Sequence, residues 1–97
     1  MKIKKGFVLR DLAGQYVVVP VGAASKKFNG IIYLNETGSF LFNELQVNLT
    51  EEELVSKLLG EYDIDEATAK SDVKEFIENL RKAKLLDEYS NHWRNSR

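Results

Sequence analysis

The residue types that most often carry catalysis or hold a metal are nearly missing from this sequence of 97 residues. There is no cysteine, which excludes disulfides, zinc–thiolate sites and cysteine nucleophiles. His92 is the only histidine, so the chain alone cannot supply a catalytic triad or a multi-histidine metal site. Carboxylates are numerous, but nothing in their spacing fixes two of them in a cleft. The sequence therefore predicts a protein that is not an enzyme and that needs neither a cofactor nor a metal.

A cluster of basic side chains is the first candidate binding surface. Lys70, Lys74, Arg81 and Lys84 fall close together around a predicted helix, beside the edge of its apolar face at Ile77. Such a cluster can be an ordinary solvated face. It can also be the basic rim of a groove that meets an acidic peptide or a phosphate.

A short apolar run is the second candidate, formed by Ile31, Ile32, Tyr33 and Leu34. Its β-branched and aromatic residues favour a strand. If this strand is the last of a meander, one of its edges carries unpaired backbone groups and can accept an extended peptide as an extra strand. Alternation allows only one of the pairs Ile31/Tyr33 and Ile32/Leu34 to face the core.

Three short strands are expected to position these residues. The first covers residues 7–9 and can extend to 12, the second covers 16–19 and stops at Pro20, and the third is the run at 31–34. A loop is expected over 22–30. The short connections favour an antiparallel meander.

The third strand is expected to run directly into a helix over about residues 36–46. Asn35 is the candidate N-cap, with Thr37 as a competitor. Gly38 is unfavourable inside a helix by about 1 kcal/mol relative to alanine. One reason to have glycine there is a close approach between this helix and another part of the chain.

Two more helices are expected. Thr50 and Glu53 form a capping-box pattern at the start of the second. The last begins after Asp63 or Asp65 and runs to about Ala83. Three strands followed by three helices predict an α+β domain of winged helix-turn-helix type. We assign residues 1–88 to this single domain and expect a flexible tail over 89–97.

Charge is unevenly distributed although the net charge is only −1. Residues 1–30 contain six basic residues and one acidic residue, whereas residues 36–66 contain nine acidic residues and one basic residue. A protein with such patches is better suited to recognising a polar partner than to binding nucleic acid over its whole surface. No apolar run approaches the roughly 18–20 residues of a membrane span, and Arg10 and Asp11 interrupt what could have been a signal-peptide core. We expect a cytoplasmic protein with no membrane partner.

Three segments in this order give the chain a resemblance to the PqqD family, whose domains are also called RiPP recognition elements. They are Phe7-Val8-Leu9-Arg10 with Gly14 and the run at 16–19, then Leu34-Asn35-Glu36-Thr37-Gly38, then the pattern from Thr50 to Leu86. Two positions depart from the family pattern. Phe42 stands where tryptophan is common, and Lys84 stands where a glycine often precedes the leucine pair.

The resemblance implies a non-catalytic accessory protein that binds the leader of a ribosomally synthesised precursor peptide and presents it to a modifying enzyme, often a radical SAM enzyme. The leader adds as a strand to the third strand and lies in a groove toward the last helix. On this hypothesis residues 31–34 pair with the leader, and Lys70, Lys74, Ile77 and Arg81 line the opposite wall.

Two other functions stay open at this stage. A DNA-binding winged helix is compatible with the basic residues of the last helix, although the nine acidic residues at 36–66 count against it. A dimerisation module would use the same open strand edge to pair with a second copy.

Overall fold

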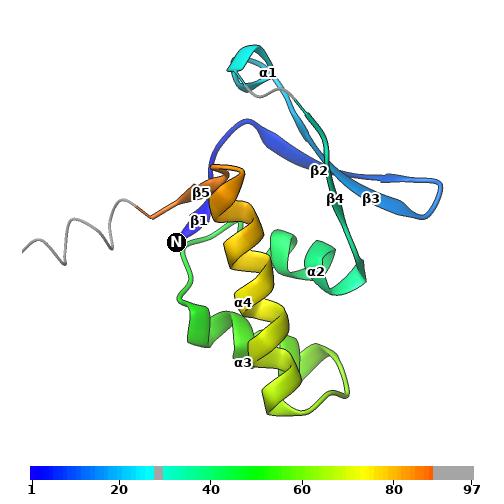
Figure 1. Cartoon of the computed structure of the whole chain (residues 1–97), viewed down its shortest axis with the longest axis vertical. Coiled ribbons are helices and arrows are strands. Elements are labelled where there is room, and N and C mark those ends of the chain that lie inside the picture. Colours follow the sequence, from blue (N-terminus) through cyan, green and yellow to red (C-terminus); the bar gives the residue numbers. More distant parts are fainter. Residues whose placement is uncertain (28–29, 89–97) are drawn as a thin grey trace, which may run out of the picture.

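The computed structural model of the protein describes residues 1–27 and 30–88. Most strands lie in the first third of the chain, and the three long helices follow them. In chain order the elements are β1 (Lys2–Ile3), β2 (Phe7–Leu12), β3 (Gln15–Pro20), α1 (Ala24–Lys27), β4 (Ile32–Leu34), α2 (Glu36–Glu44), α3 (Glu51–Glu61), α4 (Glu66–Lys82) and β5 (Leu86–Asp87). Figure 1 shows the sheet of β2, β3 and β4 on one side of α2, with α3 and α4 on the other. The α+β prediction is confirmed. The predicted tail at 89–97 lies outside the described residues.

The main sheet is an antiparallel meander with the strand order β2-β3-β4, as predicted. Ala13 and Gly14 both have positive φ, 55° and 86°, which suits a tight two-residue hairpin turn. The Gly14 backbone N–H donates to the Asp11 carboxylate at 3.1 Å. Pro20 ends β3, and because proline has no N–H it cannot continue the ladder.

The expected loop after β3 contains one short helix, α1. Its first turn is supported by Ser25, whose hydroxyl and backbone N–H both donate to the Gly22 carbonyl, at 2.7 and 3.1 Å. The helix has four residues, which is too few for a periodic apolar pattern. The sequence reasoning missed it for that reason.

A second, two-stranded sheet joins the beginning of the chain to the end of its described part. Lys2 lies opposite Asp87 and Ile3 opposite Leu86. Lys84, at φ 63°, reverses the chain after α4. Leu85 and Leu86 are both buried, as is Ile3, so the chain packs back on the core here. The pairing itself was not predicted, because a strand of two residues has no detectable alternation.

Local capping signals start the three long helices. The Asn35 side chain caps α2, Thr50 and Glu53 form a complete capping box on α3, and Asp65 caps α4. All three confirm the sequence prediction. The Asp65 carboxylate accepts from the Thr68 backbone N–H at 2.8 Å, and hydrogen bonding from Thr68 lowers the pKa of Asp65.

The core lies where the three helices meet the inner face of the sheet. Phe42 is 2% exposed, whereas Phe40 is only partly buried and contacts Tyr62 edge to face, with ring centroids 5.7 Å apart. Phe42 is thus a core residue, and Phe40 lies partly at the surface. Among the described residues, none of the helices has both the length and the apolar character that crossing a bilayer requires.

Candidate functional site

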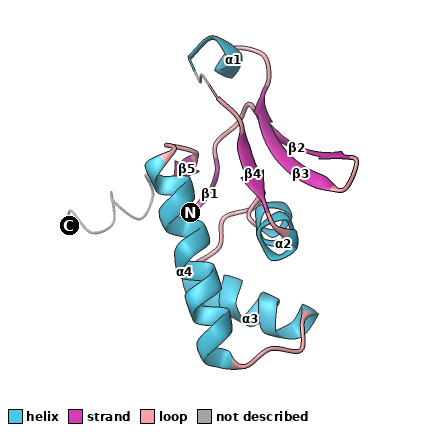
Figure 2. Cartoon of the chain, turned by 45° about the vertical axis from the view of Figure 1, so that its right-hand side comes forward, coloured by secondary structure: helices cyan, strands magenta, loops and turns pink. Residues whose placement is uncertain are grey.

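β4 has an open edge. It pairs with β3 on one side, and no strand of the described chain pairs with its other side. Nor does any described residue outside the sheet form a backbone hydrogen bond with residues 31–34. Figure 2 shows β4 as the strand of the sheet nearest to α4. An exposed strand edge of this kind can pair with another extended chain.

The side chains of this segment alternate. Ile32 and Leu34 pack against the core, whereas Ile31 is 57% exposed and Tyr33 is 64% exposed. The structure therefore decides between the two pairs that the sequence left open. A strand added to β4 would alternate in the same way, with every second side chain directed toward the helices.

A groove runs between β4 and α4, with a volume of about 180 Å³. Residues from four parts of the fold line it. They are Tyr33 and Leu34 from β4, Asn35, Thr37 and Gly38 from the strand-to-helix junction, Leu41 from α2, and Asp72, Glu75, Phe76, Asn79 and Leu80 from α4. The open strand edge and the groove are thus adjacent.

The junction between β4 and α2 forms one end of the groove wall. The Asn35 carboxamide oxygen accepts from the Gly38 backbone N–H at 2.8 Å and from the Thr37 hydroxyl at 3.2 Å. A Cβ at Gly38 would lie 2.9 Å from that oxygen and 3.3 Å from the Leu34 Cβ. The expected close approach at Gly38 is confirmed, and the surface approached is the end of β4 itself.

The α4 wall of the groove is acidic, not basic. Asp72 and Glu75 line it together with the neutral Asn79. Asp72 is half-buried and Glu75 is exposed. Neither carboxylate belongs to any of the ion pairs formed within the described part of the chain. The wall expected from the sequence consisted of Lys70, Lys74, Ile77 and Arg81 and did not include these carboxylates.

Lys70 and Lys74 lie elsewhere. They line a separate depression between α3 and α4, together with residues such as Glu52 and Val55. The Lys70 ammonium lies 2.8 Å from the Glu66 carboxylate, and this interaction raises the pKa of Lys70. The structure does not bring these lysines to the groove beside β4, so a contact between them and a bound peptide stays a prediction.

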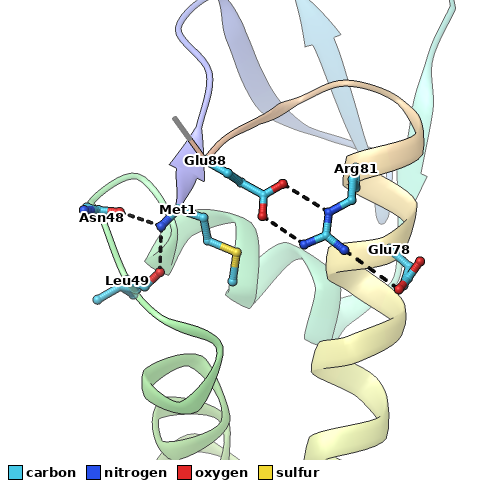
Figure 3. Close-up of polar contacts among 6 residues, drawn as sticks. All are labelled: Met1, Asn48, Leu49, Glu78, Arg81 and Glu88. Atoms are coloured by element: carbon cyan, nitrogen blue, oxygen red, sulfur yellow. Dashed lines mark hydrogen bonds and ion pairs between the residues drawn. The ribbon is translucent and has the colours of Figure 1, made fainter. Parts of the chain in front are cut away.

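Ile77 and Arg81 are also engaged within the protein. Ile77 is 3% exposed and belongs to the core. The Arg81 guanidinium donates from Nε and Nη2 to the two carboxylate oxygens of Glu88, at 3.1 and 2.9 Å, and its Nη1 lies 3.9 Å from Glu78 (Figure 3). Arg81 therefore ties α4 to the segment after β5.

The same view shows a second contact between distant parts of the chain. The amino group of Met1 donates to Asn48 and Leu49, in the connection between α2 and α3.

The Arg81–Glu88 pair leads to a prediction about pH. The hydrogen bond from Arg81 lowers the pKa of the Glu88 carboxyl below its ordinary value of 4.5. Because the pKa is lower in the folded state, the pair stabilises the protein above about pH 4.5, and its contribution is lost as the pH falls through the folded-state pKa. We expect Glu88→Gln to lower the free energy of unfolding by up to about 1 kcal/mol at neutral pH, since the side chains are partly exposed.

The measurement is urea unfolding of wild type and variant at about pH 7 and about pH 3, spanning the ordinary pKa of glutamate. The difference between the two proteins should be smaller at the lower pH. A difference of the same size at both values would mean that the substitution acts through packing rather than charge.

The chain resembles known proteins in its family and in its fold. The sequence matches, over residues 8–86, the family described as "Coenzyme PQQ synthesis protein D (PqqD)". None of the curated proteins matches it. Among the solved structures that are similar is TbiB1 in complex with the TbiA(beta) leader peptide, with 24% identity, a TM-score of 0.67, and coverage of 90% of this chain and 95% of that one.

A second similar structure is a lasso peptide synthetase B1 complexed with the leader peptide. Its identity is 13% and its TM-score 0.66, with coverage of 87% of this chain and 93% of that one. At these identities the similarity shows that the fold is shared. The sheet and the helices therefore belong to an arrangement that two other proteins also adopt.

Proposed function

This chain belongs to the PqqD family, and on that premise we propose that it binds the leader of a ribosomally synthesised precursor peptide. PqqD-family proteins are non-catalytic peptide-binding proteins, not enzymes. The leader would add as a strand to β4 and place its inward-facing side chains in the groove beside α4. Two proteins of the same fold have structures with leader peptides, which supports the proposal.

The observation that carries the proposal is the open edge of β4 next to the groove. Backbone pairing along residues 31–34 would supply hydrogen bonds that do not depend on the leader's sequence. The groove would then recognise side chains. Backbone pairing would hold the extended peptide, and the groove would distinguish one peptide from another.

We further propose that the bound leader is presented to a peptide-modifying enzyme, of the radical SAM class, in the cytoplasm where the precursor is synthesised. A small domain that holds only the leader leaves the rest of the precursor free to enter another active site. Co-purification of the protein with the modifying enzyme encoded beside it, with and without the precursor, tests this part separately.

An amide-resolved NMR titration tests leader binding. Isotope-labelled protein is titrated with the leader of a short peptide encoded beside its gene, with a scrambled leader and a generic DNA duplex as controls. We expect saturable shifts at residues 31–34 and along the α4 wall at 72–80, and none with DNA. Shifts with DNA and none with the leader would contradict the proposal and favour the winged-helix DNA-binding alternative.

The same open edge would also suit pairing with a second copy of the chain. Light scattering over a range of protein concentrations separates the two functions. A monomer that becomes a one-to-one complex on addition of leader agrees with peptide binding. A dimer that the leader cannot dissociate would favour a dimerisation module.

A further inference from the structure

We infer that the groove selects a leader segment with a lysine or arginine two residues from an apolar anchor. The inference rests on the proposed function and specifies the chemistry of the peptide. It follows from the two surfaces that an added strand would meet, an apolar floor and an acidic wall.

The floor offers an apolar contact. It is formed by Leu34 and Leu41, which lie on the sheet and α2 side, and by Phe76 and Leu80 of α4. Leu41, Phe76 and Leu80 are at most 6% exposed. A leucine-like side chain on the added strand would find a closely packed apolar surface here and would be anchored mainly by the loss of water from its own apolar surface.

The wall requires a cation. When a peptide covers Asp72 and Glu75, their carboxylates lose water, and an unpaired desolvated charge is costly. No cation of the described residues can compensate, because the groove lining contains neither lysine nor arginine and the ion pairs within the described chain leave both carboxylates out. The compensating charge must therefore come from the ligand.

A metal ion does not fit this role. No group of three or more histidine, cysteine, aspartate or glutamate residues in the described part of the chain could hold one. A lysine or arginine side chain carries its own flexible stem and can reach the rim of the wall from an added strand. A neutral or acidic leader segment would leave the carboxylates uncompensated.

The spacing follows from strand geometry. Side chains that face the same side of a strand are two residues apart. If the apolar anchor and the cation both face α4, the recognised pattern is apolar–any–cation, or the reverse order, within the segment that pairs with β4. This is a short pattern that can be sought in the peptide encoded beside the gene.

The first test uses the double variant Asp72→Asn/Glu75→Gln, which keeps shape and removes both charges. Its matched control is Asp63→Asn/Glu52→Gln, which removes the same two charges from exposed positions outside the groove. The probes are the leader encoded beside the gene and three synthetic ten-residue peptides that differ at one position, containing Leu-Thr-Lys, Leu-Thr-Gln or Leu-Thr-Glu. Affinities are measured by calorimetry at low and high salt.

We expect wild type and the control variant to bind the lysine peptide best, about tenfold more tightly than the glutamate peptide, with the preference weakening as salt increases. The groove variant should lose the preference. The charge-swapped variant Asp72→Lys/Glu75→Lys should reverse it. Circular dichroism and thermal unfolding establish that each variant is folded.

The outcomes separate the inference from the function on which it rests. Leader binding that is equal in the groove variant and the control variant, with no preference among the three peptides, would overturn the inference and leave the proposed function standing. Failure of wild type to bind either the leader or any peptide would overturn both.

Discussion

Proline at one of the two positions 32 and 33 is expected to abolish leader binding while leaving the protein folded. In an antiparallel pair, successive backbone N–H groups point to opposite edges of a strand. One of Ile32 and Tyr33 therefore donates toward β3, and the other directs its N–H to the open edge. Proline has no N–H, and its ring obstructs a neighbouring strand on the side where the N–H was.

The two proline variants should behave differently. The one that faces β3 should lose stability, because a hydrogen bond of the meander is removed. The one that faces the open edge should keep its unfolding temperature and lose at least about tenfold in affinity, equivalent to about 1.4 kcal/mol, for the leader. Calorimetry and thermal unfolding on both variants measure the two effects.

Tyr33→Ala and Ile32→Val are the controls, since they shorten the side chains and keep both N–H groups. Tyr33→Ala removes a side chain that lines the groove but keeps the backbone N–H, so its affinity measures how much of any loss at position 33 comes from the side chain. A folded proline variant at the open edge with wild-type affinity would mean that the leader is held by side chains alone. Strand addition to β4 would then be wrong.

Replacing Gly38 by alanine is expected to destabilise the protein by about 1–3 kcal/mol, although alanine is the better helix former. The added Cβ would lie 2.9 Å from the Asn35 oxygen that caps α2 and 3.3 Å from the Leu34 Cβ. To accommodate it, either the cap must break or α2 must move away from the end of β4. Because Leu34 and Asn35 also line the groove, leader affinity should fall as well.

Gly60→Ala provides the matched control within the same chain. Gly60 is also helical, in α3, but a Cβ there would meet nothing within 4 Å. Only helix propensity then acts, and the substitution should stabilise by up to about 1 kcal/mol. Urea unfolding of both variants should therefore give shifts of opposite sign. Stabilisation in both would show that the contact at Gly38 relaxes without cost.

The parts of the fold that were predicted correctly depend on local signals. Asn35, Thr50 and Asp65 each cap a helix through contacts within the next three residues, so the sequence near each cap contains all the relevant information. The meander follows similarly from short turns and from Pro20. In contrast, the pairing of Lys2 with Asp87 brings together the two ends of the described chain, and no local pattern encodes it.

The lining of the groove beside β4 was predicted only on its strand side, and the reason is geometric. The strand edge at residues 31–34 followed from the order of the elements. The opposite wall did not, because an apolar arc on a helix has two borders and periodicity does not tell which one lies beside the sheet. Asp72 and Arg81 are nine residues apart, or about two and a half turns, so they lie on opposite sides of α4. The sequence reasoning chose the basic border, whereas the acidic border lines the groove.

The small sheet of β1 and β5 determines when the fold can be completed during synthesis. Ile3 donates its N–H to the Leu45 carbonyl and Lys4 donates to the Leu85 carbonyl, so the first strand cannot reach its final place until residue 86 has left the ribosome. The meander emerges earlier, with the edge of β4 open before α4 has been synthesised. A nascent chain of this protein therefore exposes the open edge of β4 before β1 can pair with β5.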